Sequence, residues 1–524
     1  METTPEQRFV LLVNPASTTN GITLSELFHY SHLGLLTLGT SVQARLATDG
    51  SNTRVLYFDG ALHGNDYLYD FLANSGRQVA VIGLSAHSHN YAACVEIARC
   101  AKKHNPKVLS VIGNDHFSAL HQRIMRQRED TFDYGFYGND VVEGFTSLVV
   151  DFLAGRLQSM SSYPGVVFRD PLGVRRTPEN PDEYERLPPV DYSLVDSLIP
   201  HAEKYRRAQT DTYRYMREGN LNAAAIDIAR GCIKFAGPRT VNEVPLNSCD
   251  FCGIVPGAKA ITSLQAERAW DRIHGAVNQG YNYLLVTADS LPSTFWPLLR
   301  AMAESRPEWH RDMTPAARPR LMCYSRADSF QPQVHDRIDV LVDELNCDHF
   351  FIGLESFTTD SLRALAKGID FKERDLLADN VAACQSIAHK GIRLTAGVVI
   401  THLGITKELM EANFQAVCAL LKKHPGLFAE LDFEPLMPIP GSLSFDYMGD
   451  PDLARARAED LGARIDQSYL ERVSSKYHTQ DIFERDELVE DFIRGCCPDI
   501  NPRIVDDYLS ESRSIVEEFG IVGG

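Results

Sequence analysis

Short apolar segments alternate with amphipathic ones over two separate stretches of this 524-residue chain, which limits the folds open to it. In the first stretch the apolar segments are expected to be strands, at Phe9–Val13, Thr53–Phe58, Val79–Leu84, Val108–Gly113 and Tyr134–Tyr137. Between them lie segments with apolar residues at helical spacing, such as residues 91–104. Strands that alternate with helices predict an α/β domain with a doubly wound parallel sheet. Such sheets bind ligands beyond the carboxyl ends of their strands.

The residues that follow these strands are small or polar, as expected at a ligand site. They are Asn14-Pro15, Asp59-Gly60, Ser85-Ala86-His87, Gly113-Asn114-Asp115-His116 and Gly138-Asn139. A glycine after a strand lets the backbone approach a ligand closely. We therefore interpret the first stretch as a ligand-binding domain.

Residues 156–220 are rich in proline and charge and lack a periodic apolar pattern, so they are expected to form an ordered linker. The alternation then resumes, with strands expected at Ala223–Ala229, Tyr283–Thr287, Arg320–Tyr324, His349–Gly353, Arg393–Ile400 and Glu430–Pro435. Six strand–helix units in this order predict a partial (β/α)6 TIM-type barrel, with its chemistry at the carboxyl ends of the strands. From about residue 449 onward the pattern is helical.

Charged, hydroxyl and thiol side chains follow the barrel strands, a concentration that a purely structural barrel would not need. The segments are Arg230-Gly231-Cys232, Ala288-Asp289-Ser290, Ser325-Arg326-Ala327-Asp328, Leu354-Glu355-Ser356, Thr401-His402 and Leu436-Met437-Pro438. Two of them have a structural alternative: Arg326 and Asp328 can form a salt bridge, and His402 can be a loop histidine with satisfied hydrogen bonds.

Three of the eleven cysteines have the arrangement of metal ligands: the pair Cys249-x-x-Cys252, and Cys232 at the end of the first barrel strand. A C-x-x-C pair puts two thiolates within reach of one metal or cluster. The pattern alone fits a zinc site completed by His or Asp as well as a [4Fe–4S] cluster with one open iron. Sixteen residues separate Cys232 from Cys249. The remaining cysteines are expected to be buried structural thiols.

Charge and hydropathy exclude several classes of protein. The net charge of −18 argues against a non-specific nucleic-acid binder, which needs a basic surface. The longest apolar runs are too short to span a bilayer. The sequence begins METTPEQRFV, without the basic and hydrophobic regions of a secretory signal, so a cytoplasmic protein with reduced thiols is expected.

Taken in order, the motifs resemble those of cobalamin (B12)-dependent radical SAM enzymes, from Phe9 to about Phe445. In the first stretch, residues 31–38 resemble P-x-G-L-x-x-L-A, residues 82–90 resemble G-I-S-x-x-T-x-N, and residues 112–118 resemble G-G-x-H-x-T/S. In the linker, residues 187–192 resemble L-P-x-P-D-Y. In the barrel, Ala229–Cys232 and Cys249–Cys252 match the two ends of a cluster loop, residues 352–356 with 365–368 match G-x-E-S…L-x-K-G, and residues 436–442 resemble x-T-P-x-P-G-T.

The resemblance implies a cobalamin-binding Rossmann-like domain (1–155), a linker (156–220), a radical SAM partial barrel (221–448) and a helical C-terminal region (449–524). It implies a [4Fe–4S] cluster on Cys232, Cys249 and Cys252. It implies S-adenosylmethionine (SAM) at Phe251, Asp289, Ser325, Arg326, Glu355 and Ser356, with Glu355, Arg326 and His402 as catalytic candidates. It implies cobalamin at Asn14, Ser85, Asn90, Gly113, Asn114, His116, Gly138 and Asn139.

The activity implied is reductive cleavage of SAM at the cluster to a 5′-deoxyadenosyl radical, with electrons from a donor such as flavodoxin or ferredoxin. The commonest outcome in such enzymes is methylation, through methylcobalamin, of an unactivated carbon of a biosynthetic small molecule. Cyclisation or rearrangement without methyl transfer is the alternative within the family. A non-catalytic B12- or zinc-binding sensor is the alternative from another class.

The chain departs from the family pattern in several ways. The usual cluster motif has three residues between its first two cysteines, where this chain has the sixteen residues 233–248, and this loop is expected to border the active-site mouth. The D-x-H-x-x-G motif is absent: Asp59 and His63 have a different spacing, so no histidine of this domain is expected on cobalt. Asn114, Asn139 and Asp140 stand at glycine- or glutamate-rich positions of the family. Residues 402–406 lack the proline and acid of G-x-P-G-E-T.

Overall fold

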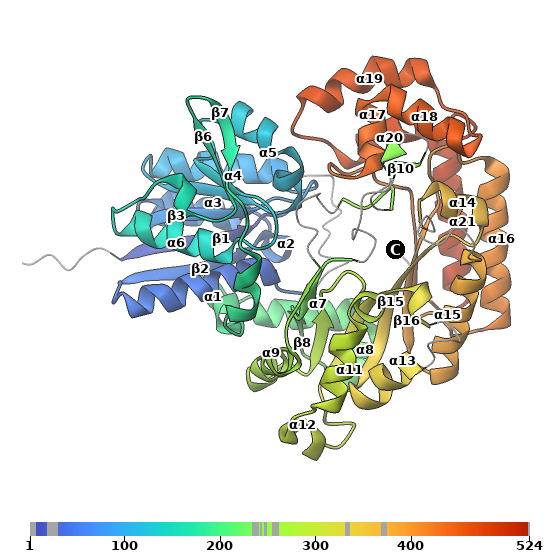
Figure 1. The fold of residues 1–524 in the computed structure, drawn as a ribbon, viewed down its shortest axis with the longest axis horizontal. Helices are drawn as coiled ribbons and strands as arrows, with labels where there is room; N and C mark the ends of the chain where they lie inside the picture. Colours follow the sequence, from blue (N-terminus) through green and yellow to red (C-terminus); the bar gives the residue numbers. More distant parts are fainter. Residues whose placement is uncertain are drawn as a thin grey trace, which may run out of the picture.

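The computed structural model describes residues 7–17, 30–232, 240–241, 244–245, 249–253, 261–330, 336–367 and 375–521. Two sheets lie side by side, each covered by its own helices, and a third, helical region packs beside both (Figure 1). Most of the spacer 233–248, and Gly368 of the L-A-K-G segment, lie outside the described residues. Of the spacer, the two-residue strands β10 (Thr240–Val241) and β11 (Val244–Pro245) pair antiparallel.

The first sheet has seven strands in the order β2-β1-β3-β4-β5-β6-β7. They are β1 (Arg8–Asn14), β2 (Thr53–Asp59), β3 (Val79–Ser85), β4 (Leu109–Gly113), β5 (Tyr134–Phe136), β6 (Val166–Asp170) and β7 (Gly173–Arg176). The pairs among β1–β5 are parallel, and β6 and β7 are antiparallel. The predicted doubly wound parallel sheet is confirmed, and each predicted strand agrees with an observed one to within one residue at either end. The β6–β7 hairpin lies in the segment expected to be a linker and was not predicted.

Helices cover both faces of this sheet. They are α1 (Leu33–Thr48), α2 (Gly60–His63), α3 (Asp66–Ser75), α4 (Tyr91–His104), α5 (Asp115–Gln127) and α6 (Val142–Leu153). Helix α1 packs against α6, and α3 packs against α4, on opposite sides of the strands (Figure 1). The middle of β1, Val10–Val13, is almost fully buried, as expected of a strand with helices on both faces.

The second sheet has six parallel strands in sequence order, so the predicted partial barrel is confirmed. They are β8 (Ala223–Ile226), β13 (Tyr283–Val286), β14 (Arg320–Arg326), β15 (Cys347–Glu355), β16 (Arg393–Val399) and β17 (Glu430–Glu434). The sheet is open between β8 and β17. The outer helices are α9 (Ala266–Asn278), α10 (Leu291–Thr294), α11 (Trp296–Glu304), α12 (Glu308–Asp312), α13 (Asp336–Asp339), α14 (Thr359–Ala364), α15 (Leu376–Lys390) and α16 (Lys407–Lys423).

The first predicted barrel strand is divided in the structure. The chain leaves the sheet after β8, at Asp227, whose carboxylate accepts hydrogen bonds from Tyr184 (2.6 Å) and Arg230 (2.8 Å). It then forms a separate short strand, β9 (Ala229–Arg230), which pairs antiparallel with β12 (Thr262–Ser263). Cys232 therefore follows β9 rather than a strand of the barrel sheet.

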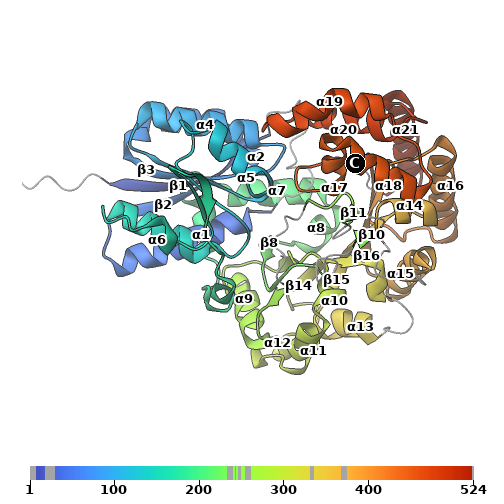
Figure 2. The ribbon, with the colours of Figure 1, turned by 45° about the horizontal axis from the view of Figure 1, so that its top comes forward.

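The C-terminal region is helical, as expected, and consists of α17 (Leu443–Gly449), α18 (Pro451–Leu461), α19 (Gln467–Thr479), α20 (Arg485–Cys496) and α21 (Pro502–Glu518). Figure 2 shows α19 extending toward the first domain. Two further helices, α7 (Ala202–Thr212) and α8 (Arg214–Gly219), connect the two sheets. A search of the described helices for a stretch long and apolar enough to cross a membrane found none.

Candidate functional site

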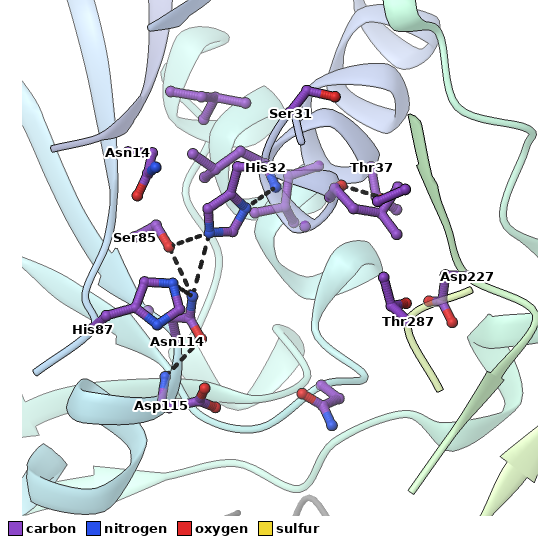
Figure 3. A pocket seen from close by; sticks show the side chains of 18 of the residues that line it. Asn14, Ser31, His32, Thr37, Ser85, His87, Asn114, Asp115, Asp227 and Thr287 are labelled. Atoms are coloured by element: carbon purple, nitrogen blue, oxygen red, sulfur yellow. Dashed lines mark hydrogen bonds between the residues drawn. The ribbon is translucent and has the colours of Figure 1, made fainter. Parts of the chain in front are cut away.

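A cavity of about 780 Å³ lies between the carboxyl ends of the two sheets. Strand ends of the first sheet form one wall, and residues in or just after β8, β9 and β13, together with Tyr324 of β14, form the other (Figure 3). The predicted site residues in its lining are Asn14, Ser85, Gly113, Asn114, Gly138, Asn139 and Asp289. The structure thus brings most of the predicted cobalamin residues and one predicted SAM residue around a single space.

A hydrogen-bonded network of neutral side chains forms part of the first wall (Figure 3). His32 Nδ1 accepts from the backbone N–H of Leu35 (3.3 Å), so the other ring nitrogen, Nε2, carries the proton and donates to Ser85 Oγ (2.7 Å). The Asn114 amide donates to Ser85 Oγ (2.8 Å) and to His87 Nε2 (3.0 Å). Burial lowers the pKa of His32 to about 3 and also lowers that of His87, so both rings are neutral at physiological pH. This wall, hereafter the neutral wall, offers donors and acceptors without charge.

His32 and His87 were not among the predicted cobalamin residues. Each lies within a segment that resembles a family motif, and His87 follows β3 by two residues. Its position after a strand had marked His87 only as one of the residues expected near a ligand. Nothing local indicates His32, since its partner Ser85 is 53 residues away in sequence.

Asn90 and His116, both predicted cobalamin residues, lie behind the cavity wall and are almost fully buried. The Asn90 side chain donates to Asn14 Oδ1 (3.3 Å) and accepts from the backbone N–H of His87 (2.8 Å). His116 Nε2 donates to the backbone carbonyl of Asp481 (2.9 Å). Asn90 therefore supports two residues that line the cavity, and His116 joins the first domain to the C-terminal region.

The turn at Gly138 and Asn139 is occupied by a carboxylate of the protein itself. Glu179 Oε1 accepts hydrogen bonds from the backbone N–H groups of Asn139 (2.8 Å) and Asp140 (3.2 Å). Gly138 has a φ of +91°, and a Cβ there would lie 1.9 Å from Glu179 Oε1. Glycine is thus required at this position for the carboxylate to reach the turn.

Asp59 is a buried carboxylate in the cavity lining. It accepts hydrogen bonds from Asn14 Nδ2 (3.0 Å), the Tyr57 hydroxyl (3.2 Å) and the Tyr205 hydroxyl. Burial raises the pKa of Asp59. Tyr205 comes from α7, within the expected linker, and was not predicted. His63 does not line the cavity, and its ring packs edge-on against that of His201 outside it.

On the opposite wall, Asp289 faces the cavity. Burial raises the pKa of Asp289 to about 6, although a hydrogen bond from the Gly231 backbone N–H opposes the shift. The carboxylates of Asp115 and Asp227 add to it. Asp289 therefore changes charge close to physiological pH, and it contacts the residue that precedes Cys232.

The three candidate cysteine ligands are described, and Cys232 and Cys249 are buried. The Cys252 N–H donates to the Cys249 carbonyl (3.0 Å), which makes a tight turn of the C-x-x-C pair. Burial lowers the pKa of the nearby Arg326, but Asp328 and the two buried cysteines raise it above its ordinary value. Among the described residues, no group of three or more His, Cys, Asp or Glu side chains that could hold a metal ion was found. Cys232 and Cys249 are thus buried beside a cation.

Arg326 already has a partner. Its Nη2 lies 3.0 Å and its Nε 3.2 Å from Asp328 Oδ2, and both side chains are largely buried. The structural alternative considered from the sequence is therefore present in the structure. Ser325, also buried, donates to the Arg326 carbonyl (3.3 Å).

Glu355 and Lys367 form a buried ion pair at the end of β15 (Nζ–Oε1, 2.9 Å). Glu355 has a φ of +60°, a strained conformation for a residue with a side chain. A Cβ on Gly353 would lie 2.3 Å from Glu355 Oε1, so glycine there makes room for the pair. The Lys367 ammonium also lies 5.9 Å from the centre of the ring of Phe251, which stands between Cys249 and Cys252 in the sequence. Lys367 was not predicted as a site residue, although its L-A-K-G segment was noted.

Ser356 and His402 are buried and fully engaged in hydrogen bonds. The Ser356 hydroxyl donates to Asn413 Oδ1 (3.1 Å). His402 Nδ1 donates to the Leu403 carbonyl (3.0 Å), and its Nε2 accepts from the Ser361 hydroxyl (2.9 Å). Burial lowers the pKa of His402 to about 4. His402 has the contacts of the structural alternative, a neutral histidine with both ring nitrogens bonded.

The C-terminal region contacts the first domain behind the neutral wall. Asp481, between α19 and α20, accepts two hydrogen bonds from Arg128 (both 2.7 Å) and one from Tyr91 (2.8 Å). Arg123 and Gln127 of α5 donate to backbone carbonyls of α19. We call the contact of Asp481 with Arg128 and Tyr91 the latch.

No protein-family model and no curated protein sequence matches this chain. Solved structures do. The radical S-adenosylmethionine methyltransferase TsrM from Kitasatospora setae, with cobalamin and a [4Fe–4S] cluster bound, is similar with a TM-score of 0.62 and 18% identity, over 83% of this chain and 77% of TsrM. For TsrM with tryptophan substrate and the SAM analogue aza-SAM, the TM-score is 0.60 and the identity 17%, over 84% of this chain and 76% of TsrM. For OxsB, a cobalamin-dependent S-adenosylmethionine radical enzyme with aqua-cobalamin bound, the TM-score is 0.55 and the identity 16%, over 86% of this chain and 56% of OxsB.

Proposed function

We propose that this chain, which has the fold of the cobalamin-dependent radical SAM methyltransferases, is itself a cobalamin-dependent radical SAM enzyme. One observation carries the proposal: a single cavity of about 780 Å³ joins the strand ends of the first domain to those of the barrel. In a doubly wound sheet and in a TIM-type barrel these ends are where ligands bind. A cofactor of each domain would thus meet in one space.

The residues present fit the cofactors in their chemistry. Cobalamin carries many neutral carboxamide side chains, and the neutral wall of His32, Ser85, His87 and Asn114 offers uncharged donors and acceptors to them. Asn14, Gly113, Gly138 and Asn139 complete the proposed cobalamin contacts. Asn90 and His116 would act from behind the wall.

For the [4Fe–4S] cluster we propose Cys232, Cys249 and Cys252 as ligands. Cys232 and Cys249 lie near Arg326, and Cys249 also lies near Lys367, which suits these thiols to the donor set because cations favour the thiolate form that binds iron. Each cysteine of such a cluster binds a different iron atom, which leaves the fourth iron for SAM.

For SAM we propose a site beside these cysteines. Asp289 faces the cavity and suits the positively charged ammonium group. Phe251, Ser325, Arg326, Glu355 and Ser356 would complete the site. Arg326 is already paired with Asp328, and Glu355 with Lys367. We therefore propose that each orients the ligand as part of its ion pair and not as a single unpaired charge. His402, with both ring nitrogens bonded, is assigned a structural role.

When bound, the cluster with SAM would supply a 5′-deoxyadenosyl radical, and cobalamin a transferable methyl group. The chain's own task is to exclude water and to hold a small-molecule substrate between the two cofactors. We propose methylation of an unactivated carbon as the outcome, with electrons from a donor such as flavodoxin or ferredoxin. The structure of TsrM, a radical S-adenosylmethionine methyltransferase, with tryptophan substrate bound supports methyl transfer to a small molecule as the outcome.

Anaerobic purification and reconstitution test the proposal. We expect about four iron and four sulfide per chain, bound cobalamin by absorbance, and production of 5′-deoxyadenosine from SAM. Cys232→Ala should lose iron and SAM cleavage, while Cys100→Ala, a part-exposed cysteine on α4, should lose neither. A colourless protein that binds zinc instead would overturn the proposal.

Methyl-labelled SAM tests the finer outcome. Label that enters a candidate substrate supports methyl transfer. Formation of 5′-deoxyadenosine and of an altered product without label would replace methyl transfer by cyclisation or rearrangement.

A further inference from the structure

The residue between Cys249 and Phe251 is an aspartate whose N–H, carbonyl and carboxylate each contact another element. The Asp250 N–H donates to the carbonyl of Leu365 (3.1 Å), just after α14. Its carbonyl accepts from both the N–H (2.9 Å) and the hydroxyl (2.8 Å) of Ser444, on α17. The backbone of the C-x-x-C turn is thus joined to the barrel on one side and to the C-terminal helices on the other.

The Asp250 carboxylate makes a second connection to the same helices. It accepts a hydrogen bond from the Tyr447 hydroxyl of α17 (2.9 Å), and Arg457 Nε of α18 lies 3.8 Å from the same oxygen. The side chains of Asp250 and Arg457 are each only 3% exposed. A buried carboxylate needs such partners, because without them its desolvation would be uncompensated.

Arg457 also contacts the barrel. Its Nη2 donates to the backbone carbonyls of Arg363 (2.9 Å) and Ala364 (3.3 Å), at the end of α14. Leu365, the next residue, holds the Asp250 N–H. One arginine therefore ties together the C-x-x-C turn, α14 and α18.

A further contact holds the far end of the turn. A Cβ on Gly253 would lie 2.4 Å from Ile439 Cδ1, so the backbone after Cys252 packs directly on the segment that leads into α17. Both ends of the five described residues 249–253 are in this way fixed against the C-terminal side of the molecule.

We propose that Asp250 is a positioning residue: held by Tyr447 and Arg457, it fixes Cys249 and Cys252 in the geometry that binds the [4Fe–4S] cluster. This inference rests on the proposed function, because it assumes that these cysteines bind a cluster. It makes the C-terminal helices part of the cluster site. It also sets the charge beside the cluster, and net charge is one of the determinants of cluster potential.

Three variants test the inference after anaerobic reconstitution: Arg457→Met, Tyr447→Phe and Asp250→Asn. Arg457→Met should reduce iron and acid-labile sulfide per chain at least twofold and change the EPR line shape of the reduced cluster. Asp250→Asn keeps the shape of the side chain but removes its charge, so whatever cluster forms should have a more positive midpoint potential. Tyr447→Phe should show the smallest loss of iron.

Matched controls come from neighbouring residues. Arg455→Met lies on the same helix and removes an exposed arginine paired with Asp452. Tyr469→Phe removes the hydroxyl of a tyrosine on α19, which donates a hydrogen bond to Asp491 on α20. Both should retain full iron content and the wild-type EPR signal, and cobalamin uptake should be unchanged in all five variants.

Wild-type iron content, line shape and potential in Asp250→Asn and Arg457→Met would overturn the inference while leaving the proposed function intact. If Arg457→Met does not fold, the potential measured in Asp250→Asn decides. A wild-type protein that takes up no cluster would overturn the proposed function, and the inference with it.

Discussion

The cobalamin side of the candidate site and the region around the candidate cysteines hold their polar side chains in different ways. On the cobalamin side, the neutral wall consists of imidazole, hydroxyl and amide groups joined by hydrogen bonds. On the cluster side, the polar side chains form buried ion pairs: Arg326 with Asp328, Lys367 with Glu355, and Arg457 with Asp250. Yet each side carries a residue with a side chain at positive φ, Asn114 (+79°) and Glu355 (+60°).

This difference has a physical consequence for ligand binding. A neutral group that faces a cavity can exchange one hydrogen-bond partner for another at a net cost of about 1 kcal/mol. A buried charge that loses its partner is left uncompensated, at a cost of about 3–5 kcal/mol. We therefore expect the cobalamin side to adapt to its ligand and the cluster side to be rigid before any ligand binds.

The largest effect is expected from breaking an ion pair of the cluster side. Lys367→Met leaves the Glu355 carboxylate buried without its cation, since the two side chains are only 14% and 10% exposed. We expect the free energy of unfolding of the apo protein to fall by about 3–5 kcal/mol, measured by urea denaturation. The double variant Lys367→Met/Glu355→Gln should recover most of this loss. Equal losses in the single and double variants would show that charge is not what stabilises this region.

The latch behind the neutral wall should show a smaller effect that depends on pH. Burial opposes ionisation of Asp481, but the hydrogen bonds from Arg128 and Tyr91 outweigh it and lower its pKa below the ordinary 3.8. A carboxylate with a lowered folded-state pKa stabilises the protein above its ordinary pKa, and this stability is lost as the pH falls through the folded-state value.

Asp481→Asn should therefore cost about 2 kcal/mol near pH 7 and progressively less below about pH 4. Urea denaturation at several pH values measures this. Asp499→Asn, which removes an exposed ion pair with Arg464, is the matched control and should cost less than about 1 kcal/mol. A loss in Asp481→Asn that is the same at acid and neutral pH would contradict the assignment of charge to the latch.

The sequence predicted the parts of the molecule that depend on local pattern. Strands buried on both faces, such as Val10–Val13, are continuous apolar runs, and the six barrel strands were predicted from apolar segments that alternate with amphipathic ones. The β6–β7 hairpin was missed because it reads as charged and exposed: β7 is Gly-Val-Arg-Arg, without an apolar face. Periodicity carries no signal for such a strand.

The site was predicted where a residue follows a strand and missed where a distant partner decides its role. Asn114 and Asp289 follow strands and do line the cavity. His116 also follows a strand, but its ring is bonded to Asp481, 365 residues further along the chain. Tyr205 reaches Asp59 from 146 residues away. Contacts over such separations come from the packing of whole domains, which a single sequence does not encode locally.

Asp289 offers a smaller effect, on binding rather than stability. Its pKa of about 6 means that its carboxylate becomes charged as the pH rises through 6. If the charged form binds the ammonium group of SAM, affinity should rise about tenfold between pH 5 and pH 7, because roughly a tenth of the carboxylates are ionised at the lower pH. Isothermal titration with SAM on the reconstituted protein measures this. Asp289→Asn should bind weakly with no such dependence, whereas an unchanged pH profile would remove Asp289 from the SAM site.

The smallest effect is expected on the neutral wall. Asn114→Ala removes the amide that bridges Ser85 and His87, but both partners face the cavity and can bond to water instead. We expect a loss of about 1 kcal/mol or less in apo stability, and a cobalamin affinity reduced about fivefold, measured by absorbance titration. Because Asn114 has a φ of +79°, alanine there adds backbone strain, and Asn114→Gly provides the strain-free control. Similar cobalamin affinities in the alanine and glycine variants, both below wild type, would assign the loss to the amide. A loss of stability in Asn114→Gly as large as that in Lys367→Met would instead mean that the cobalamin side and the cluster side are equally rigid.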